Sequence, residues 1–221
     1  MKIGIIGAGH IGGTLTRRLT ELGHEVKVAN SRGPETLQDL AKETGATPTT
    51  VHDAVRDVDL VIVTIPEKNI PDLPKDLFKN VPEHVPVVDT GNYYPNNRDG
   101  FIKEIEEGMP ESVWVSQQLG RPVIKAFNTI WYKNLLEKGR PKGDPNRLAL
   151  PVAGDDEKQK KIVMDLIDEL GFDPVDSGTL SESWRQQPGT PCYVQELNVE
   201  QLKEALEKAS PERPENFRYQ Q

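Results

Sequence analysis

Residues 3–12 read Ile-Gly-Ile-Ile-Gly-Ala-Gly-His-Ile-Gly, and this stretch decides the fold. The apolar run over residues 2–6 is typical of a buried parallel strand. The glycines after it fit the pattern Gly-x-Gly-x-x-Gly, and residues 10–22 carry an apolar stripe at helical spacing that ends at Gly23. A strand, a glycine-rich turn and a helix in this order predict a dinucleotide-binding turn of the Rossmann type.

Each glycine of this turn has its own expected role. Gly7 permits the tight turn, Gly9 lets the backbone approach a pyrophosphate, and Gly12 lets the helix pack close to the strand. The pyrophosphate is expected on the free backbone N–H groups at the start of the helix, where His10 and Ile11 lie. We interpret His10 as a variable position whose backbone N–H faces phosphate, rather than as a catalytic base.

The end of the second expected strand, residues 26–29, indicates which dinucleotide binds. An acidic residue there would accept hydrogen bonds from a free ribose 2′-hydroxyl. The chain instead reads Asn30-Ser31-Arg32, and a guanidinium binds a 2′-phosphate through charge-assisted hydrogen bonds. The sequence therefore predicts NADP rather than NAD, with the 2′-phosphate at Ser31 and Arg32, although Glu35 adds a negative charge nearby.

Strands and helices alternate along the rest of the chain. We expect strands over residues 59–65, 85–89, 122–127, 148–153 and 173–176, and a loop with short helical pieces over 66–84. Two helices are expected to begin at Pro34 and Thr50, and two more to cover 101–107 and 157–170. A last helix is expected after a capping box of Asn198 and Gln201. This alternation predicts an α/β fold, a doubly wound and mainly parallel sheet with a C-terminal helical extension. We place residues 1–196 in one NADP-binding domain and 197–221 in a C-terminal helix and a mobile tail.

Composition excludes several classes of function. The chain has 221 residues and a formal net charge of −8, whereas non-specific nucleic-acid binding needs a basic surface. Its longest apolar stretch, residues 60–65, is far shorter than the ~20 residues of a membrane span, and the N-terminus lacks a signal-peptide layout. The one cysteine, Cys192, is interpreted as inert packing, and His52 and His84 lack metal-ligand spacing. We therefore expect a cytoplasmic protein that binds neither nucleic acid, membrane nor metal.

Ligands of such sheets lie beyond the carboxyl ends of the strands. Three segments occupy that place here: Thr64-Ile65-Pro66, residues 89–94 and residues 125–129. We expect them to wall a nicotinamide pocket. Aromatic residues gather nearby in sequence and suit a flat ring substrate, although simple loop packing is the alternative for each of them: Tyr93, Tyr94, Trp131 and Tyr132. Lys125 lies in a strand, where a structural ion pair is favoured over catalysis.

Taken together, these motifs resemble the family of NADPH-dependent reductases of the deazaflavin coenzyme F420 (also written F-420). The resemblance covers roughly residues 1–185, departs from the family's pattern after Ser181, and rests on residues 7–12, 30–32, 63–66, 125–129, 153–156 and 171–180. It implies a Rossmann-type fold, usually dimeric, with the NADP phosphates over the glycine turn. It also implies that the nicotinamide is bordered by the segments after Ile65 and around Ala126, so the further cofactor-binding residues are Thr64, Ile65, Pro66, Ala126 and Asn128.

The resemblance implies hydride transfer between NADP(H) and a planar acceptor, a deazaflavin or a flavin. Such a transfer needs alignment and exclusion of water more than an acid or a base, and we predict no catalytic side chain. Two alternatives stay open. One is a reductase of a small carbonyl or imine, with Tyr93, Tyr94 or Lys125 as proton donor. The other is a non-catalytic NADP(H)-sensing protein. We expect a homodimer in each case.

Overall fold

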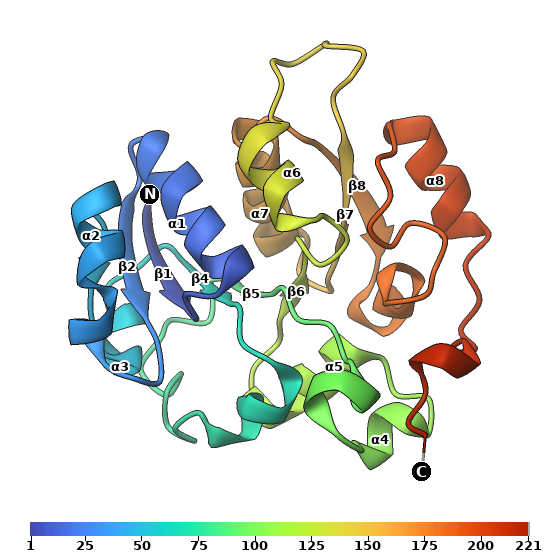
Figure 1. Ribbon diagram of the computed structural model, residues 1–221, viewed down its shortest axis with the longest axis horizontal. Helices are drawn as coiled ribbons and strands as arrows, with labels where there is room; N and C mark the ends of the chain where they lie inside the picture. Colours follow the sequence, from blue (N-terminus) through green and yellow to red (C-terminus); the bar gives the residue numbers. More distant parts are fainter. Residues whose placement is uncertain (221) are drawn as a thin grey trace.

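The computed structural model describes residues 1–220 and forms an eight-stranded sheet in the order β3-β2-β1-β4-β5-β6-β7-β8 (Figure 1). The strands are β1 (Lys2–Ile6), β2 (Glu25–Ala29), β3 (Thr47–Pro48), β4 (Leu60–Val63), β5 (Val87–Asp89), β6 (Ile124–Lys125), β7 (Ala149–Ala153) and β8 (Asp173–Gly178). Neighbouring strands are parallel except β6 and β7, which pair antiparallel through Lys125 and Ala153. The predicted Rossmann-type α/β fold is confirmed.

Helices cover both faces of the sheet. They are α1 (His10–Glu21), α2 (Gln38–Thr44), α3 (Val51–Ala54), α4 (Lys103–Glu106), α5 (Glu111–Leu119), α6 (Tyr132–Glu137), α7 (Glu157–Glu169) and α8 (Val199–Glu207). Side chains of α1, α6 and α7 pack on one face with Ile3, Ile5 and Ile62, whereas α3 and α5 pack on the other with Val61 and Val63. Side chains alternate between the faces along each strand, as a sheet buried on both sides requires.

The strand order reverses at β1, which lies between β2 and β4. Ile6 is opposite Ala29 on one side and Val63 on the other, so these three strands end level with one another. The backbone N–H of Gly7 donates to the Ala29 carbonyl at 2.8 Å, and that of Thr64 donates to the Ile6 carbonyl at 2.8 Å. The three segments after these strands therefore begin at one edge, the topological switch point where such folds bind ligands.

Several expected elements differ from the structure. The predicted strand over 122–127 is paired only over Ile124–Lys125, because Phe127 adopts a left-handed φ of 63° that turns the chain. The predicted helix over 101–107 is confined to Lys103–Glu106, and the helix expected from Pro34 starts as a 3-10 turn before α2. Three further elements were not predicted from the sequence, namely α5, α6 and a 3-10 helix over Leu180–Gln186.

The C-terminal segment is docked rather than mobile, so the prediction for the tail is wrong up to residue 220, while Gln221 lies outside the described residues. Arg213 forms an ion pair with buried Glu111 at 2.5 Å. Asn96 donates to the carbonyl of Arg218 at 2.8 Å and accepts from the backbone N–H of Gln220 at 2.9 Å. These contacts fasten the tail beside α4 and α5, as Figure 1 shows.

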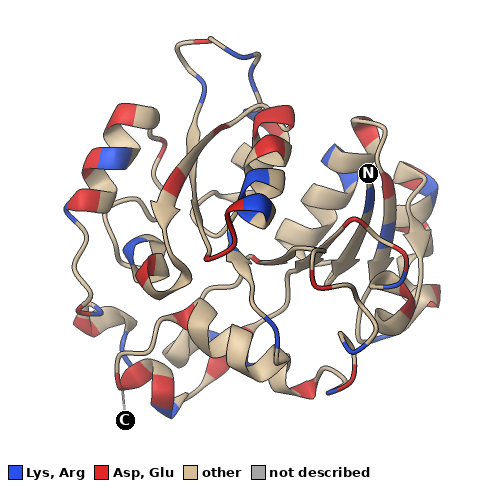
Figure 2. Ribbon diagram, turned by 180° about the vertical axis from the view of Figure 1, so that it is seen from behind, with Lys and Arg blue, Asp and Glu red and all other residues tan. Residues whose placement is uncertain are grey.

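Charge is spread over the surface of the molecule. Figure 2 shows acidic and basic residues mixed along the outer helices. Helix α7, for example, begins with the sequence Glu-Lys-Gln-Lys-Lys, which contains charges of both signs. None of the helices in residues 1–220 is long and apolar enough to cross a membrane.

Candidate functional site

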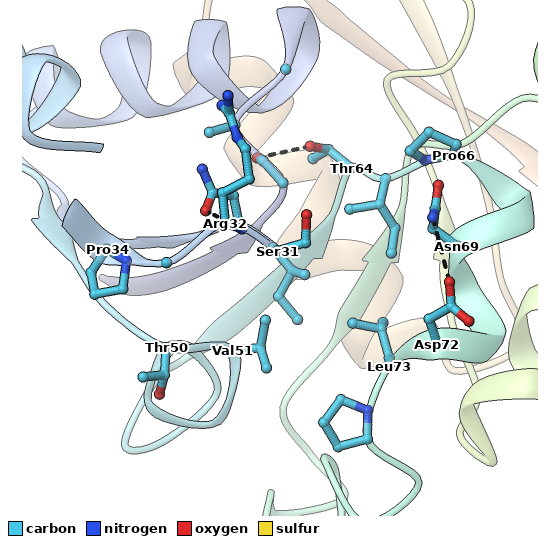
Figure 3. A pocket seen from close by; sticks show the side chains of 18 residues that line it. Ser31, Arg32, Pro34, Thr50, Val51, Thr64, Pro66, Asn69, Asp72 and Leu73 are labelled. Carbon is cyan, nitrogen blue, oxygen red and sulfur yellow. Dashed lines mark hydrogen bonds between the residues drawn. The ribbon is translucent and has the colours of Figure 1, made fainter. Parts of the chain in front are cut away.

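A cavity of about 620 Å³, called here the larger cavity, opens at the carboxyl ends of β1, β2 and β4. Ser31 and Arg32 lie on one side of it, and Pro66, Asn69 and Asp72 lie on the other (Figure 3). Eight of the predicted cofactor residues line it: Gly7, Gly9, Asn30, Ser31, Arg32, Thr64, Ile65 and Pro66. The opposite wall includes Asn69, Asp72 and Leu73, which were not predicted because the prolines of residues 66–84 indicate a loop.

The glycines of the turn differ in their surroundings. Gly7 has a φ of +107°, and a Cβ there would lie 2.5 Å from the carbonyl oxygen of Thr64. A Cβ on Gly12 would overlap the carbonyl oxygen of Gly7, whereas a Cβ on Gly9 would meet nothing within 4 Å. Gly7 and Gly12 therefore serve the close packing of α1 on the sheet, and Gly9 presents bare backbone to the larger cavity.

The first turn of α1 offers free donors to this cavity. Gly9 caps the helix without a side-chain hydrogen bond, and no acidic residue stands in the first turn. The first backbone N–H groups of any helix lack intrahelical acceptors and carry partial positive charge. Thr64 fixes the turn from the side, since its hydroxyl donates to the Gly7 carbonyl at 3.0 Å (Figure 3). This arrangement suits an anion that lies across Gly9.

The loop after β2 is ordered by Asn30. Its side-chain oxygen accepts from the backbone N–H of Arg32 at 3.0 Å, and its amide donates to the hydroxyl of Thr36 at 2.9 Å. The guanidinium of Arg32 is exposed and forms no hydrogen bond or ion pair with any of residues 1–220. Glu35 folds back against Gly33, where its carboxylate fills the place a side chain would take.

A second cavity of about 160 Å³, called here the aromatic cavity, adjoins the start of α1. Three further predicted residues line it, namely His10, Ile11 and Asn128, whereas Gly12 and Ala126 are buried and line neither cavity. The ring of His10 stacks on Tyr132 with centroids 4.3 Å apart. Eleven of the thirteen predicted cofactor residues thus line one of two cavities, which meet along the chain at the consecutive residues Gly9 and His10.

Asn128 is held by a network of amides. Its Nδ2 donates to Oδ1 of Asn92 at 3.0 Å and to the carbonyl of Gln186 at 2.6 Å, while Nε2 of Gln186 donates to its Oδ1 at 3.0 Å. Asn128 is only 3% exposed. Gln186 lies 58 residues after Asn128 in the sequence, so sequence spacing offered no signal for Gln186.

The aromatic residues divide between core and cavity. Tyr93 is fully buried, and its hydroxyl donates to the Gly100 carbonyl at 2.8 Å, so the packing alternative holds for this residue. Tyr94, Trp131 and Tyr132 line the aromatic cavity, and the phenol oxygen of Tyr94 is hydrogen-bonded to that of Tyr193. Tyr193 comes from the segment after residue 181, where the motifs gave no guidance.

Lys125 is a structural residue, as the sequence analysis favoured. Its ammonium donates to Oδ2 of Asp89 at 3.0 Å and to the Gly91 carbonyl at 2.6 Å, and its side chain is fully buried. Burial lowers the pKa of Lys125, but Asp89, Glu111 and Glu67 together outweigh burial and leave the pKa above its ordinary value. The pair links the ends of β5 and β6. No group of side chains able to hold a metal ion occurs within residues 1–220.

Strand order, glycine turn and the cavity at the switch point together define a Rossmann-type dinucleotide-binding fold. Residues 2–93, less than half of the chain, match the model of the family described as NADP oxidoreductase, coenzyme F420-dependent. The hypothetical protein SMa0349 from Sinorhizobium meliloti has a solved structure that is 30% identical, with a TM-score of 0.75 over 89% of this chain and 95% of that one.

Two further similarities are more limited. The structure of a candidate F420-dependent NADP reductase from Arthrobacter is 21% identical, with a TM-score of 0.61 over 83% of this chain and 87% of that one, and shows the shared fold. The protein YjhV of Escherichia coli is 53% identical over 73 residues. That match spans 33% of this chain and 46% of YjhV, less than half of either.

Proposed function

We propose that this protein binds NADP(H) across both cavities and passes hydride to a planar acceptor of the deazaflavin class, such as coenzyme F420. The adenosine half lies in the larger cavity, and the nicotinamide lies toward the aromatic cavity. The observation that carries the proposal is the unpaired guanidinium of Arg32 on the rim of the larger cavity. No acidic residue competes for it at positions 29–31, directly after β2.

The 2′-phosphate is the ligand group that best matches Arg32 and Ser31. A guanidinium at the end of β2 attracts a phosphate and offers it several donors at once. The backbone of this loop is already fixed by Asn30, so little ordering accompanies binding. Glu35 lies against Gly33, and this placement keeps its carboxylate in the loop's own packing.

The pyrophosphate fits over Gly9. Open space stands in front of this residue, and the free N–H groups at the start of α1 point to the same place. The local donors hold the anion although the whole chain carries a net charge of −8. When bound, NADPH supplies the hydride, and the residues of this chain align the two rings and exclude water.

The acceptor is proposed to lie over the aromatic cavity. Trp131 borders it with 47% of its surface exposed, and Tyr132 stacks on His10 beside it. Exposed and stacked aromatic faces favour a flat conjugated ring. The family's description and the Arthrobacter relative's name both point to a deazaflavin acceptor, which is why we place this class first.

Anaerobic mixing of the protein with NADPH and coenzyme F420, with FMN in parallel, tests the proposal. We expect NADPH absorbance to fall with F420 as acceptor and much more slowly with FMN. Tight NADPH binding without oxidation by either acceptor would favour the sensor alternative. Failure to bind NADPH would overturn the assignment of both cavities.

A further inference from the structure

The geometry points to Tyr193 as a proton donor that gives the aromatic cavity a second activity, the reduction of small aldehydes and ketones. This inference rests on the proposed binding of NADPH. It adds a catalytic residue and a substrate class, whereas transfer to a planar acceptor requires neither.

The two phenols of the aromatic cavity have one O–H donor that no hydrogen bond within the described residues uses. Tyr94 and Tyr193 both line the aromatic cavity, and their oxygens are hydrogen-bonded only to each other among the described residues. Each phenol brings one O–H donor. A single hydrogen bond between them uses one proton, and the second O–H has no protein acceptor. A carbonyl oxygen in the cavity would take this free donor.

We assign the proton released to the substrate to Tyr193, with Tyr94 as its hydrogen-bond partner. Burial raises the pKa of both phenols. The hydrogen bond with Tyr94 lowers the pKa of Tyr193 by less than burial raises it, so the pKa of Tyr193 stays above its ordinary value. The guanidinium of Arg98 lies 4.9 Å from the centre of the Tyr94 ring and lowers the pKa of both phenols, whereas the carboxylate of Glu111 raises both.

Backbone strain gathers around the same cavity. Phe127 and Val194 adopt left-handed φ angles of 63° and 53°, and both line it. Val194 is β-branched, for which this conformation is unfavourable. Its N–H donates to the Thr129 carbonyl at 2.9 Å, which fixes the neighbouring Tyr193 over the end of β6. Strain maintained in this way is characteristic of functional sites.

The reaction balances without another component. The carbonyl carbon receives a hydride with its electron pair from NADPH, and the C=O π pair moves to the oxygen. That oxygen takes the proton of Tyr193, so that the O–H bond of the phenol breaks and an alcohol forms. The phenolate of Tyr193 is held by the donor of Tyr94 and regains a proton from water. The volume of the cavity, about 160 Å³, suits a small carbonyl compound inside it, whereas the planar acceptor of the proposed function lies over the cavity.

The test compares the wild-type protein with Tyr193→Phe, Tyr94→Phe and Tyr219→Phe. The last variant removes a phenol on the docked tail, outside the cavity. NADPH oxidation is followed with acetaldehyde, butanone and cyclohexanone. We expect turnover by the wild type, a loss of about 10²–10⁴-fold for Tyr193→Phe, a smaller loss for Tyr94→Phe, and no change for Tyr219→Phe.

A binding measurement supplies a readout besides turnover. Titration of cyclohexanone into the protein with NADP⁺, which cannot reduce it, should show on the order of 3- to 10-fold weaker binding to Tyr193→Phe, as expected for one lost hydrogen bond. Absence of carbonyl reduction by the wild type, or equal rates and affinities for Tyr193→Phe, overturns the inference. NADPH binding is titrated separately for every variant. Binding without carbonyl reduction contradicts only the role of Tyr193, whereas loss of binding by the wild type contradicts the proposed function.

Discussion

Gly12 packs so closely on Gly7 that a Cβ on the first would overlap the carbonyl oxygen of the second. The hydroxyl of Thr64 closes the same space from β4. Gly9, two residues after Gly7, has nothing within 4 Å of its Cβ position. One turn therefore contains glycines that serve the fold and a glycine that leaves room for a ligand.

Substituting these glycines separates the two roles. Gly12→Ala should lower the free energy of unfolding by about 1–3 kcal/mol or more, because backbone atoms have to move. Gly9→Ala should leave that free energy within about 1 kcal/mol of the wild-type value and weaken NADPH binding at least about tenfold, or about 1.4 kcal/mol. Urea denaturation and calorimetric titration measure the two effects. An unchanged NADPH affinity in Gly9→Ala would contradict the placement of the pyrophosphate over Gly9.

Arg32→Ala should weaken NADPH binding far more than NADH binding. One charge-assisted hydrogen bond contributes on the order of 1.5–3 kcal/mol, which corresponds to roughly 10- to 150-fold in affinity. NADH lacks the 2′-phosphate and should lose little. Arg140→Ala, an exposed arginine in the loop before β7, serves as the control for a general change of charge. Equal losses for both cofactors would argue against a phosphate contact.

The buried ion pair of Arg213 and Glu111 joins the C-terminal tail to α5, so the stability of the protein should depend on it. Glu111 is fully buried and also accepts from the backbone N–H of Tyr93 at 3.1 Å. Arg213→Met leaves that carboxylate without its cation and should cost about 3–5 kcal/mol of stability. The double variant Arg213→Met with Glu111→Gln should recover part of this loss. A double variant as unstable as the sum of the single ones would show that the pair is not coupled.

Cys192 should be unreactive in the folded protein. It is 2% exposed, and burial raises the pKa of its thiol to about 11. Maleimide reacts with the deprotonated thiolate, which is scarce at pH 8 when the pKa is raised. Labelling at pH 8 should therefore be slow until the protein unfolds. Since the folded pKa lies above the unfolded one, the folded state holds the extra proton, and stability should fall as the pH rises from about 9 toward 11. Fast labelling at pH 8 without denaturant would contradict this burial.

The sequence predicted the first half of the fold well because its signals are local. The Gly-x-Gly-x-x-Gly turn, the glycine after α1 and the apolar strands are short-range patterns, and β1, β2 and β4 formed as expected. Later elements depend on tertiary contacts. Helix α5 carries Glu111, Ser112 and Trp114 in buried positions, so no polar face marks it as an amphipathic helix.

The residues of the candidate site likewise divide into those marked by local motifs and those brought together only by folding. Local motifs located Arg32 and Thr64 at the larger cavity, and the strand ends located Asn128. Asn128 is hydrogen-bonded to Gln186, which lies 58 residues farther along the chain. Tyr94 is hydrogen-bonded to Tyr193, which lies 99 residues farther along. Only the folded chain brings these residues together. The homodimer and the cytoplasmic location stay predictions.

Side-by-side calorimetric titrations of the wild-type protein with NADPH and NADH test the central claim most directly. We predict that NADPH binds at least about tenfold more tightly, a difference of about 1.4 kcal/mol, and that this preference shrinks as salt screens the exposed Arg32. NADH binding as tight as NADPH binding, or no binding of either, would contradict the assignment of the larger cavity.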